Sequence, residues 1–315
     1  MRRYTNNPLI RPTNIPNIPP DIIDATSVFN PGAIKFNDKI LLMLRVQNRA
    51  RETFFIMAES EDGIKFDIAD EIIKWERLGK VKETIYHIYD PRITKVENEY
   101  YIMFAMDIES GCFLGLGKTI DFKKFEFLGI VSKEDNRNGV LFPEKVSGKY
   151  LRLDRPNINQ LTDGPLTGSE IWFSESDDLL EWQPVNKIIS GRNHYWDELI
   201  GAGPPPVKTT KGWLCVYHGI AMHYQPIYQA GVMLLDLKDP SKVISRGRFN
   251  ILEPRELYET VGQVPNVIFP TGLIVDDIDE NGFAKMDSEV KLYYGAADTV
   301  IGLATSTIEK LIEKC

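Results

Sequence analysis

Residues that could do chemistry recur in this chain beside prolines and at the ends of strand-like runs. Those near a proline are Asn30, Asp90, Arg92, Glu144 and the run 203–206, and those at the ends of runs are Arg45, Asp107, Arg155, His218 and Asp298. A lone charge is costly to bury, so each charged member of this set is either paired or functional. Any one of them could be a salt bridge, but a set drawn from every part of the chain indicates a site. Carboxylates can act there as general acids, and arginines bind anions.

Five segments with one order of elements position these residues. Each begins at or near a proline, runs into a strand, turns at polar residues and returns as an aromatic-rich strand, and a further strand follows it. The segments are 30–45, 90–104, 142–155, 205–219 and 269–295. Their prolines recur about every 50–65 residues, the length of one four-stranded propeller blade with its loops. We therefore predict an all-β fold, a five-bladed β-propeller, with a large β-sandwich as the alternative. The innermost strands of a propeller begin at a central channel, where the polar set would converge.

The repeats span most of the chain, so we expect a single propeller domain over residues 1–315. Residues 1–24 are rich in proline and are expected to run extended around the propeller. Residues 306–314 are predicted to form a short C-terminal helix, with Ser306 as its N-cap.

Composition argues against several classes of protein. The formal net charge of -8 over 315 residues is unlike a general nucleic-acid binder, which needs a basic face. The three cysteines form no CxxC pair and the four histidines have no ligand-like spacing, so we expect neither a disulfide framework nor a metal site. No run approaches the roughly 20 apolar residues of a membrane span, and the first residues do not resemble a signal peptide. We expect a cytoplasmic protein that needs no cofactor, and a homodimer by default.

Several short motifs carry a resemblance to a known family. They are YDPR at 89–92, VLFPE at 140–144, GAGPPP at 201–206 and YYGAAD at 293–298, with NPG at 30–32 and VPNV at 264–267. Together they resemble the signatures of glycoside hydrolase family 130, and the resemblance extends from residue 30 to the C-terminus. It implies a five-bladed propeller that acts on β-mannosides. Most members are inverting phosphorylases, and some are inverting β-1,2-mannosidases.

The resemblance also implies roles for individual residues. Asp90 would be the catalytic acid and would protonate the leaving glycosidic oxygen through a hydroxyl of the bound mannose, which requires a protonated carboxyl in the ground state. The positions that would bind the sugar are Asn30, Arg45, Tyr89, Glu144 and Asp298. Inorganic phosphate, as co-substrate, would be held by Arg137, Arg155, Tyr228 and His218, because two guanidiniums make a good phosphate fork.

One departure from the family keeps an alternative open. The phosphorylases carry a lysine just before the Ile-Gly that opens the GAGPPP motif, where this chain has Leu199, preceded by Asp197 and Glu198. A missing cation weakens phosphate binding, and Glu198 could be the general base of an inverting hydrolase. We favour phosphorolysis of β-1,2-mannobiose or short β-1,2-oligomannan to mannose 1-phosphate, because both arginines and the tyrosine remain. The alternatives are an inverting β-1,2-mannosidase that uses water, and a non-catalytic carbohydrate-binding propeller.

Overall fold

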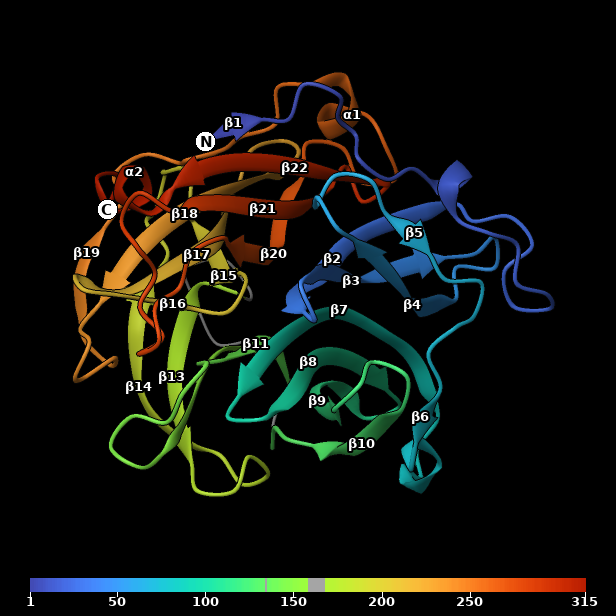
Figure 1. Ribbon diagram of the computed structural model, residues 1–315, viewed down its shortest axis with the longest axis horizontal. Helices are drawn as coiled ribbons and strands as arrows, with labels where there is room; N and C mark the ends of the chain where they lie inside the picture. Colours follow the sequence, from blue (N-terminus) through green and yellow to red (C-terminus); the bar gives the residue numbers. More distant parts are fainter. Residues whose placement is uncertain (134, 158–167) are drawn as a thin grey trace.

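Five β-sheets are arranged around a common centre in the computed structural model, which describes residues 1–133, 135–157 and 168–315 (Figure 1). Paired strands are antiparallel, except that β6 joins β10 in parallel. The sheets follow one another around the ring in chain order, so the protein is a five-bladed β-propeller, as predicted. None of the helices in the described part of the chain is long and apolar enough to cross a membrane.

The first three blades are built from consecutive strands. Blade 1 contains β2 (Ser27–Phe36), β3 (Lys39–Gln47), β4 (Thr53–Ser60) and β5 (Asp67–Ile68). Blade 2 contains β7 (Ile85–Val96), β8 (Glu99–Ile108), β9 (Gly111–Thr119) and β10 (Phe125–Ile130), with β6 (Trp75–Glu76) at its outer edge. Blade 3 contains β11 (Asn136–Leu141), β12 (Tyr150–Pro156), β13 (Glu170–Ser176) and β14 (Gln183–Ser190).

The last two blades complete the ring. Blade 4 contains β15 (Leu199–Ala202), β16 (Val207–Thr209), β17 (Gly212–Ala221), β18 (Ile227–Leu235) and β19 (Val243–Arg246). Blade 5 contains β20 (Ile268–Val275), β21 (Glu289–Ala296), β22 (Val300–Thr307) and β1 (Arg2–Arg3). The third repeat was placed too late along the chain, because the inner strand of blade 3 is β11 and not the segment 142–146.

The apolar core is divided among the contacts between blades. Each of the five large apolar clusters joins residues of two neighbouring blades, as where Met43 of blade 1 packs with Phe104 of blade 2. A middle strand is therefore covered on both faces, and β17 is buried at every position. Strands of this kind are apolar along their whole length instead of alternating with polar residues. The inner strands contact one another at the centre, which positions whatever they carry there.

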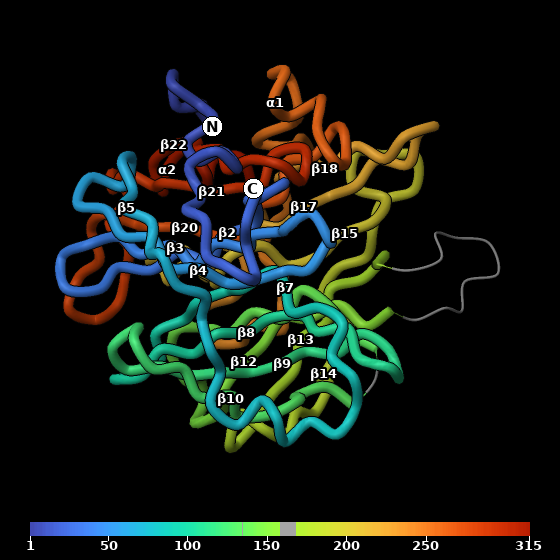
Figure 2. Tube along the Cα trace, turned by 90° about the vertical axis from the view of Figure 1, so that its right-hand side faces the viewer, coloured from blue at the N-terminus to red at the C-terminus, as the bar shows by residue number. Residues whose placement is uncertain are grey.

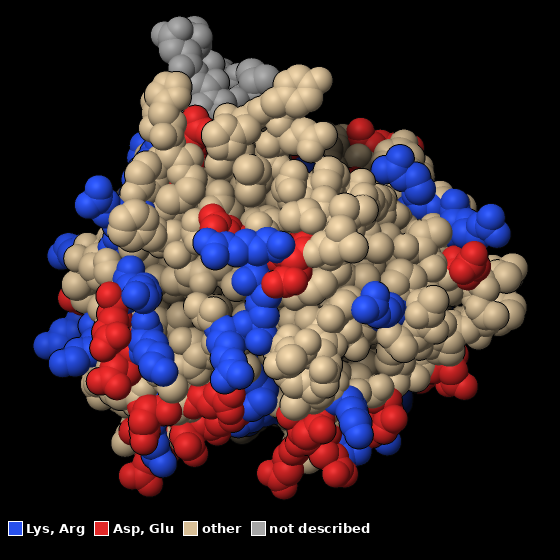
Figure 3. Space-filling view, turned by 90° about the horizontal axis from the view of Figure 1, so that it is seen from above, with Lys and Arg blue, Asp and Glu red and all other residues tan. Residues whose placement is uncertain are grey.

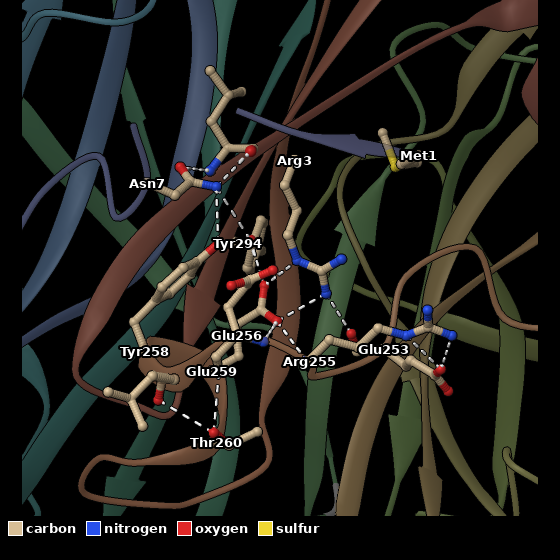
Figure 4. Close-up of polar contacts among 12 residues, drawn as sticks. Met1, Arg3, Asn7, Glu253, Arg255, Glu256, Tyr258, Glu259, Thr260 and Tyr294 are labelled. Carbon is tan, nitrogen blue, oxygen red and sulfur yellow. Dashed lines mark hydrogen bonds and ion pairs between the residues drawn. The ribbon is translucent and has the colours of Figure 1, made fainter. Parts of the chain in front are cut away.

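The N-terminal segment closes the ring. β1 pairs with β22, so blade 5 combines strands from both ends of the chain, and the two termini lie near this blade (Figure 1 and Figure 2). The Arg3 guanidinium donates two hydrogen bonds, of 2.7 and 2.8 Å, to the buried Glu259 carboxylate, which also accepts from the Tyr294 hydroxyl at 2.8 Å (Figure 4). Burial raises the pKa of Glu259, but the hydrogen bonds from Arg3, the backbone and Tyr294 outweigh it and leave the pKa lowered. Residues 1–24 thus supply a strand and an ion pair as well as a surface run.

The helices are short and differ in part from the prediction. The C-terminal helix α2 covers Ile308–Ile312 instead of 306–314, and its N-cap is Thr307. Ser306 is not the cap because it still pairs with Val290 in blade 5, where β22 continues to Thr307. The helix α1 (Leu257–Thr260) was not predicted, and neither were the 3-10 turns η1 (Pro12–Asn14) and η2 (Leu78–Lys80). Elements of three or four residues are too short to show a helical period.

Candidate active site

Three inner strands break in the same way near the centre of the propeller. In β2, β7 and β11 the register shifts so that two residues oppose one, which is a β-bulge. The first bulged residues are Asn30, Asp90 and Asn138, with φ of 46, 55 and 55°. Asn and Asp tolerate this left-handed conformation better than most residues, and bulges re-aim side chains next to functional sites. The equivalent position of three blades therefore carries an amide, a carboxylate and an amide.

The Asp90 carboxylate is oriented by two residues of blade 1. Its Oδ1 accepts a hydrogen bond from Asn30 Nδ2 at 2.9 Å and forms an ion pair with Arg45 Nη1 at 2.7 Å. The Arg45 guanidinium is held between two rings, 4.3 Å from the centroid of Phe29 and 4.7 Å from that of Tyr89. Asp90 Oδ2 accepts no hydrogen bond from the residues that the structure describes. One oxygen thus fixes the carboxyl group, and the other remains for chemistry.

Asp298 adds a second carboxyl group to the same cluster. It lies in the tight turn between β21 and β22, where Ala297 and Asp298 both have positive φ, of 47 and 48°. Burial raises the pKa of Asp298 to about 6, while the Arg45 guanidinium opposes this rise and the Asp90 carboxylate adds to it. Arg45 therefore lies close to two carboxyl groups, and Asp298 is protonated more readily than a free aspartic acid.

Blade 3 contributes two arginines side by side. Arg137 of β11 lies opposite Arg155 of β12. Neither forms a salt bridge with a carboxylate of residues 1–133, 135–157 or 168–315. Burial and the neighbouring Arg137 charge lower the pKa of the Arg155 guanidinium. Asp154 does not pair with Arg155, because its Oδ2 accepts a hydrogen bond from Arg152 Nε at 2.8 Å. Two buried or half-buried cations without salt-bridge partners are what an anion site requires.

His218 and Tyr228 lie beside these arginines. The His218 ring is fully buried, 4.5 Å from the Phe269 centroid and 6.2 Å from that of Tyr228. Neither of its ring nitrogens has a hydrogen-bond partner in the described part of the chain. Burial and the charges of Arg155 and Arg92 hold the pKa of His218 well below its usual value, so the imidazole is neutral. Burial also raises the pKa of Tyr228, whose hydroxyl therefore stays a donor.

Comparison with known proteins identifies the family. The model of the family described as beta-1,4-mannooligosaccharide phosphorylase matches residues 1–315. This chain belongs to glycoside hydrolase family 130. It is 30% identical to a beta-1,4-mannooligosaccharide phosphorylase of Ruminococcus albus over 99% of this chain and 89% of that protein, and 34% identical to a 1,2-beta-oligomannan phosphorylase of Thermoanaerobacter sp. over 89% and 90%. The solved β-1,2-mannobiose phosphorylase of Listeria innocua superposes with a TM-score of 0.85 at 27% identity, over 99% of this chain and 98% of that one.

Two further residues belong to the site. The sequence alone did not single out Asn138 and gave Arg92 no definite role. Asn138 was missed, although aligning its Asn-Gly with the Asn-Pro of residue 30 and the Asp-Pro of residue 90 would have found it. Arg92 is a brace: it is fully buried and donates to Gly203 O at 2.8 Å, to Asp90 O at 3.0 Å and to Asn138 Oδ1 at 3.3 Å. Burial lowers the pKa of Arg92 to about 10, so it stays charged at neutral pH. This one side chain ties blades 2, 3 and 4 together under the site.

Two residues predicted to bind sugar have other partners. The Tyr89 hydroxyl donates to Asp107 Oδ1 at 2.8 Å and contacts Cys112 Sγ at 3.3 Å, and its ring packs on Arg45. Glu144 follows the other end of β11, six residues past Asn138, and pairs with Lys208 Nζ at 2.8 Å. The structure therefore does not bring Glu144 to the cluster.

Glu198 and the aromatic residues beside it brace a loop. The two oxygens of Glu198 accept backbone N–H groups of His194 at 3.1 Å and Met222 at 2.7 Å. The Trp196 ring stacks on the Tyr217 ring with centroids 5.7 Å apart. Asp197 is fully buried and pairs with Arg192 and Arg246. Among the described residues no three His, Cys, Asp or Glu side chains are grouped closely enough to hold a metal ion.

Proposed function

We propose that this chain is an inverting glycoside phosphorylase that cleaves β-mannosides with inorganic phosphate and releases mannose 1-phosphate. The substrate we propose is β-1,2-mannobiose or a short β-1,2-oligomannan, and the reaction is a transfer of a hexosyl group to phosphate. The observation that carries this proposal is the pair Arg137 and Arg155, which form no salt bridge with a carboxylate of the described residues. The charges of Arg155, Asp298, Arg137 and Asp90 all act on the pKa of Tyr228, so the two arginines and the Asp90 acid surround one tyrosine.

The acid half of the reaction falls to blade 1 and blade 2. Asp90 would protonate the leaving oxygen through a sugar hydroxyl, with Oδ1 fixed by Asn30 and Arg45 and Oδ2 available to deliver the proton. Asp298 and Arg45 would bind neighbouring hydroxyls of the same mannose. The partly protonated Asp298 limits the repulsion between the two carboxyl groups, because they are not both ionised below pH about 6.

The phosphate half falls to blades 3 and 4. In an inverting reaction the nucleophile attacks from the face of the sugar opposite the leaving group. Arg137 and Arg155 would neutralise the phosphate, and the Tyr228 hydroxyl and Asn138 amide would donate further hydrogen bonds. The neutral His218 can donate a hydrogen bond to phosphate from one ring nitrogen and accept one from a phosphate hydroxyl at the other. These groups would compensate for the positive charge that is missing at position 199, where this chain has leucine instead of the lysine of the phosphorylases.

Hydrolysis is the less supported alternative, for a geometric reason. A general base needs a carboxylate oxygen directed at the attacking water. Both oxygens of Glu198 instead accept backbone hydrogen bonds that hold the loop 194–198 and the hairpin at Met222. Water is also a neutral nucleophile, so hydrolysis would not need the positive charges of Arg137 and Arg155.

The decisive experiment is incubation with β-1,2-mannobiose with and without inorganic phosphate. We expect mannose 1-phosphate and mannose in equal amounts, only when phosphate is present. Free mannose alone, formed at a rate independent of phosphate, would establish a mannosidase and overturn the proposal. Binding of the disaccharide without turnover under either condition would indicate a carbohydrate-binding propeller.

We also propose that the enzyme is cytoplasmic and forms a homodimer. All three cysteines are free thiols, as a reducing compartment allows. The face around α1 suits contact with a second copy, because Leu257 and Val261, one helical turn apart, are 76% and 64% exposed, and broad areas of this face carry no charge (Figure 3). For a chain of net charge -8, the uncharged areas of this face are where a second copy meets least repulsion. Light scattering during gel filtration measures the mass, and a monomer would contradict this assignment.

A further inference from the structure

The Arg137 guanidinium is held by a thiol and not by a carboxylate. Its Nε donates to Cys112 Sγ at 3.3 Å, across the contact between blades 2 and 3. Cys112 is buried, and burial raises the pKa of its thiol to about 11, so the group is neutral at physiological pH. The terminal nitrogens of Arg137 donate to no group in the described residues.

A tyrosine and an aspartate complete the surroundings of this thiol. Asp107 of β8 lies opposite Cys112 of β9 in the register of blade 2. The Tyr89 hydroxyl bridges them, donating to Asp107 Oδ1 at 2.8 Å and lying 3.3 Å from Cys112 Sγ. Burial lowers the pKa of Arg137, but Tyr89, Cys112 and Asp107 outweigh burial and raise it. Asp107 therefore balances the charge of Arg137 from a distance, with no ion pair between them within 4 Å.

We propose that Cys112, Tyr89 and Asp107 form a positioning unit that presents Arg137 to phosphate; this inference rests on the proposed function. A carboxylate in the place of the thiol would bind the guanidinium in a two-point fork and occupy the nitrogens that phosphate needs. A neutral, weakly accepting thiol fixes Nε alone and leaves both terminal nitrogens free. The three residues of blade 2 are thus positioning residues for phosphate binding and do not touch the substrate.

The test compares Cys112→Ala with a matched control, Cys215→Ala, which removes another buried thiol that has no contact with the site. We expect Cys112→Ala to raise the KM for phosphate about two- to tenfold, the value of one hydrogen bond. The kcat at saturating phosphate and the KM for the mannoside should change little. Cys112→Ser should recover part of the phosphate affinity, since its hydroxyl still accepts from Nε over a longer gap. Cys215→Ala should leave the KM for phosphate unchanged.

A second variant and a binding measurement separate the ways in which this inference could fail. Tyr89→Phe keeps the ring on Arg45 but removes the bridge to Asp107, and should raise the KM for phosphate by less than Cys112→Ala. Calorimetric titration with inorganic phosphate measures binding without turnover. If the wild-type protein binds phosphate and Cys112→Ala binds it equally well, the positioning role is wrong while the proposed function stands. If Cys112→Ala lowers only the melting temperature, the thiol is a packing residue. A wild-type protein that neither binds nor uses phosphate overturns both proposals.

Discussion

At the scale of single residues, the proposed site keeps the carboxyl groups for acid catalysis apart from the arginines for phosphate binding. Asp90 and Asp298 lie with Arg45 on one side, and Arg137 and Arg155 lie without carboxylate partners in the described chain on the other. If the carboxylates were paired with all the arginines, no positive charge would remain for an anion. The distribution of ion pairs therefore favours the proposed phosphate site over a set of structural salt bridges.

Replacing Asp90 by Asn tests the acid. The amide can still accept hydrogen bonds from Asn30 and Arg45, but it cannot deliver a proton. We expect kcat to fall by about 10²–10⁴ with an unchanged melting temperature. An activated mannoside, whose leaving group needs no proton, should be cleaved with a much smaller loss. A folded variant that keeps more than about a hundredth of the wild-type rate would place the acid elsewhere.

Replacing Asp298 by Asn tests the raised pKa through stability. Between its ordinary pKa near 3.8 and about 6, folded Asp298 holds a proton that the unfolded chain has released. Wild-type stability therefore falls as the pH rises through this window, by on the order of 1–3 kcal/mol, and is level above it. The amide of the Asp298→Asn variant cannot ionise, so we expect the stability advantage of this variant over the wild type to grow between pH 4 and pH 6 while activity is lost. Denaturant unfolding at several pH values measures it, and a difference that does not vary with pH would refute the assignment.

At the scale of elements, β-bulges in three inner strands do the positioning. A regular strand would point Asn30, Asp90 and Asn138 along the alternation of its sheet, whereas the bulges aim them at a common centre. Blade 4 has no such bulge at this point, but its backbone at Gly201 comes close to side chains of the site. A Cβ at Gly201 would lie 2.4 Å from His218 Cε1 and 2.5 Å from Asn138 Nδ2. The absence of a side chain at Gly201 therefore leaves room for the His218 ring and the Asn138 amide.

The variant Gly201→Ala should therefore weaken phosphate binding at the proposed site. The methyl group must displace the His218 ring or the Asn138 amide, and overpacking of this kind costs about 1–3 kcal/mol of stability. We expect a raised KM for phosphate together with a lower melting temperature. Gly79→Ala is the control, because nothing lies within 4 Å of a Cβ there. Equal behaviour of the two variants would show that the approach of blade 4 to blade 3 is not tight.

At the scale of the whole molecule, the ring is closed by a strand and an ion pair. β1 completes blade 5, and Glu259 joins it to the segment that leads to Asn266, whose carbonyl accepts the backbone N–H of Tyr228. The closure therefore lies on the same stretch of chain that holds Tyr228, a residue of the proposed phosphate site. Loss of the closure should loosen blade 5 before it affects the chemistry.

The variant Arg3→Ala tests this closure. It leaves the buried Glu259 carboxylate without its cation, and breaking a buried pair in this way costs about 3–5 kcal/mol. Arg2→Ala is the control, because the neighbouring Arg2 is exposed and forms no salt bridge with the described residues. We expect a clear fall in the free energy of unfolding for Arg3→Ala alone, measured by denaturant unfolding at pH 7. The wild-type advantage should shrink as the pH falls through the lowered pKa of Glu259, since protonation removes the charge that Arg3 compensates. Equal stability of the two variants would mean that the ion pair between Arg3 and Glu259 does not stabilise the closure.

The sequence by itself determined the repeat, the class of fold and most of the polar set at the centre. Strand periods, turns and the Asn-Pro and Asp-Pro steps are local features, so they can be recognised without knowing which blade lies beside which. The family motifs extended this to Asp90, Asn30, Arg45 and Asp298, whose positions the structure brings together.

Only the tertiary structure decided which polar atoms meet. It gave the Tyr89 hydroxyl to Asp107, paired Glu144 with Lys208 at the other end of its strand, and used Glu198 to hold a loop. It also joined Arg3 to Glu259, 256 residues away. These partners come from different blades or distant loops, so their distances depend on the closing of the ring. A hydrogen bond requires its atoms to approach within about 3 Å, and local sequence patterns carry no information at that precision.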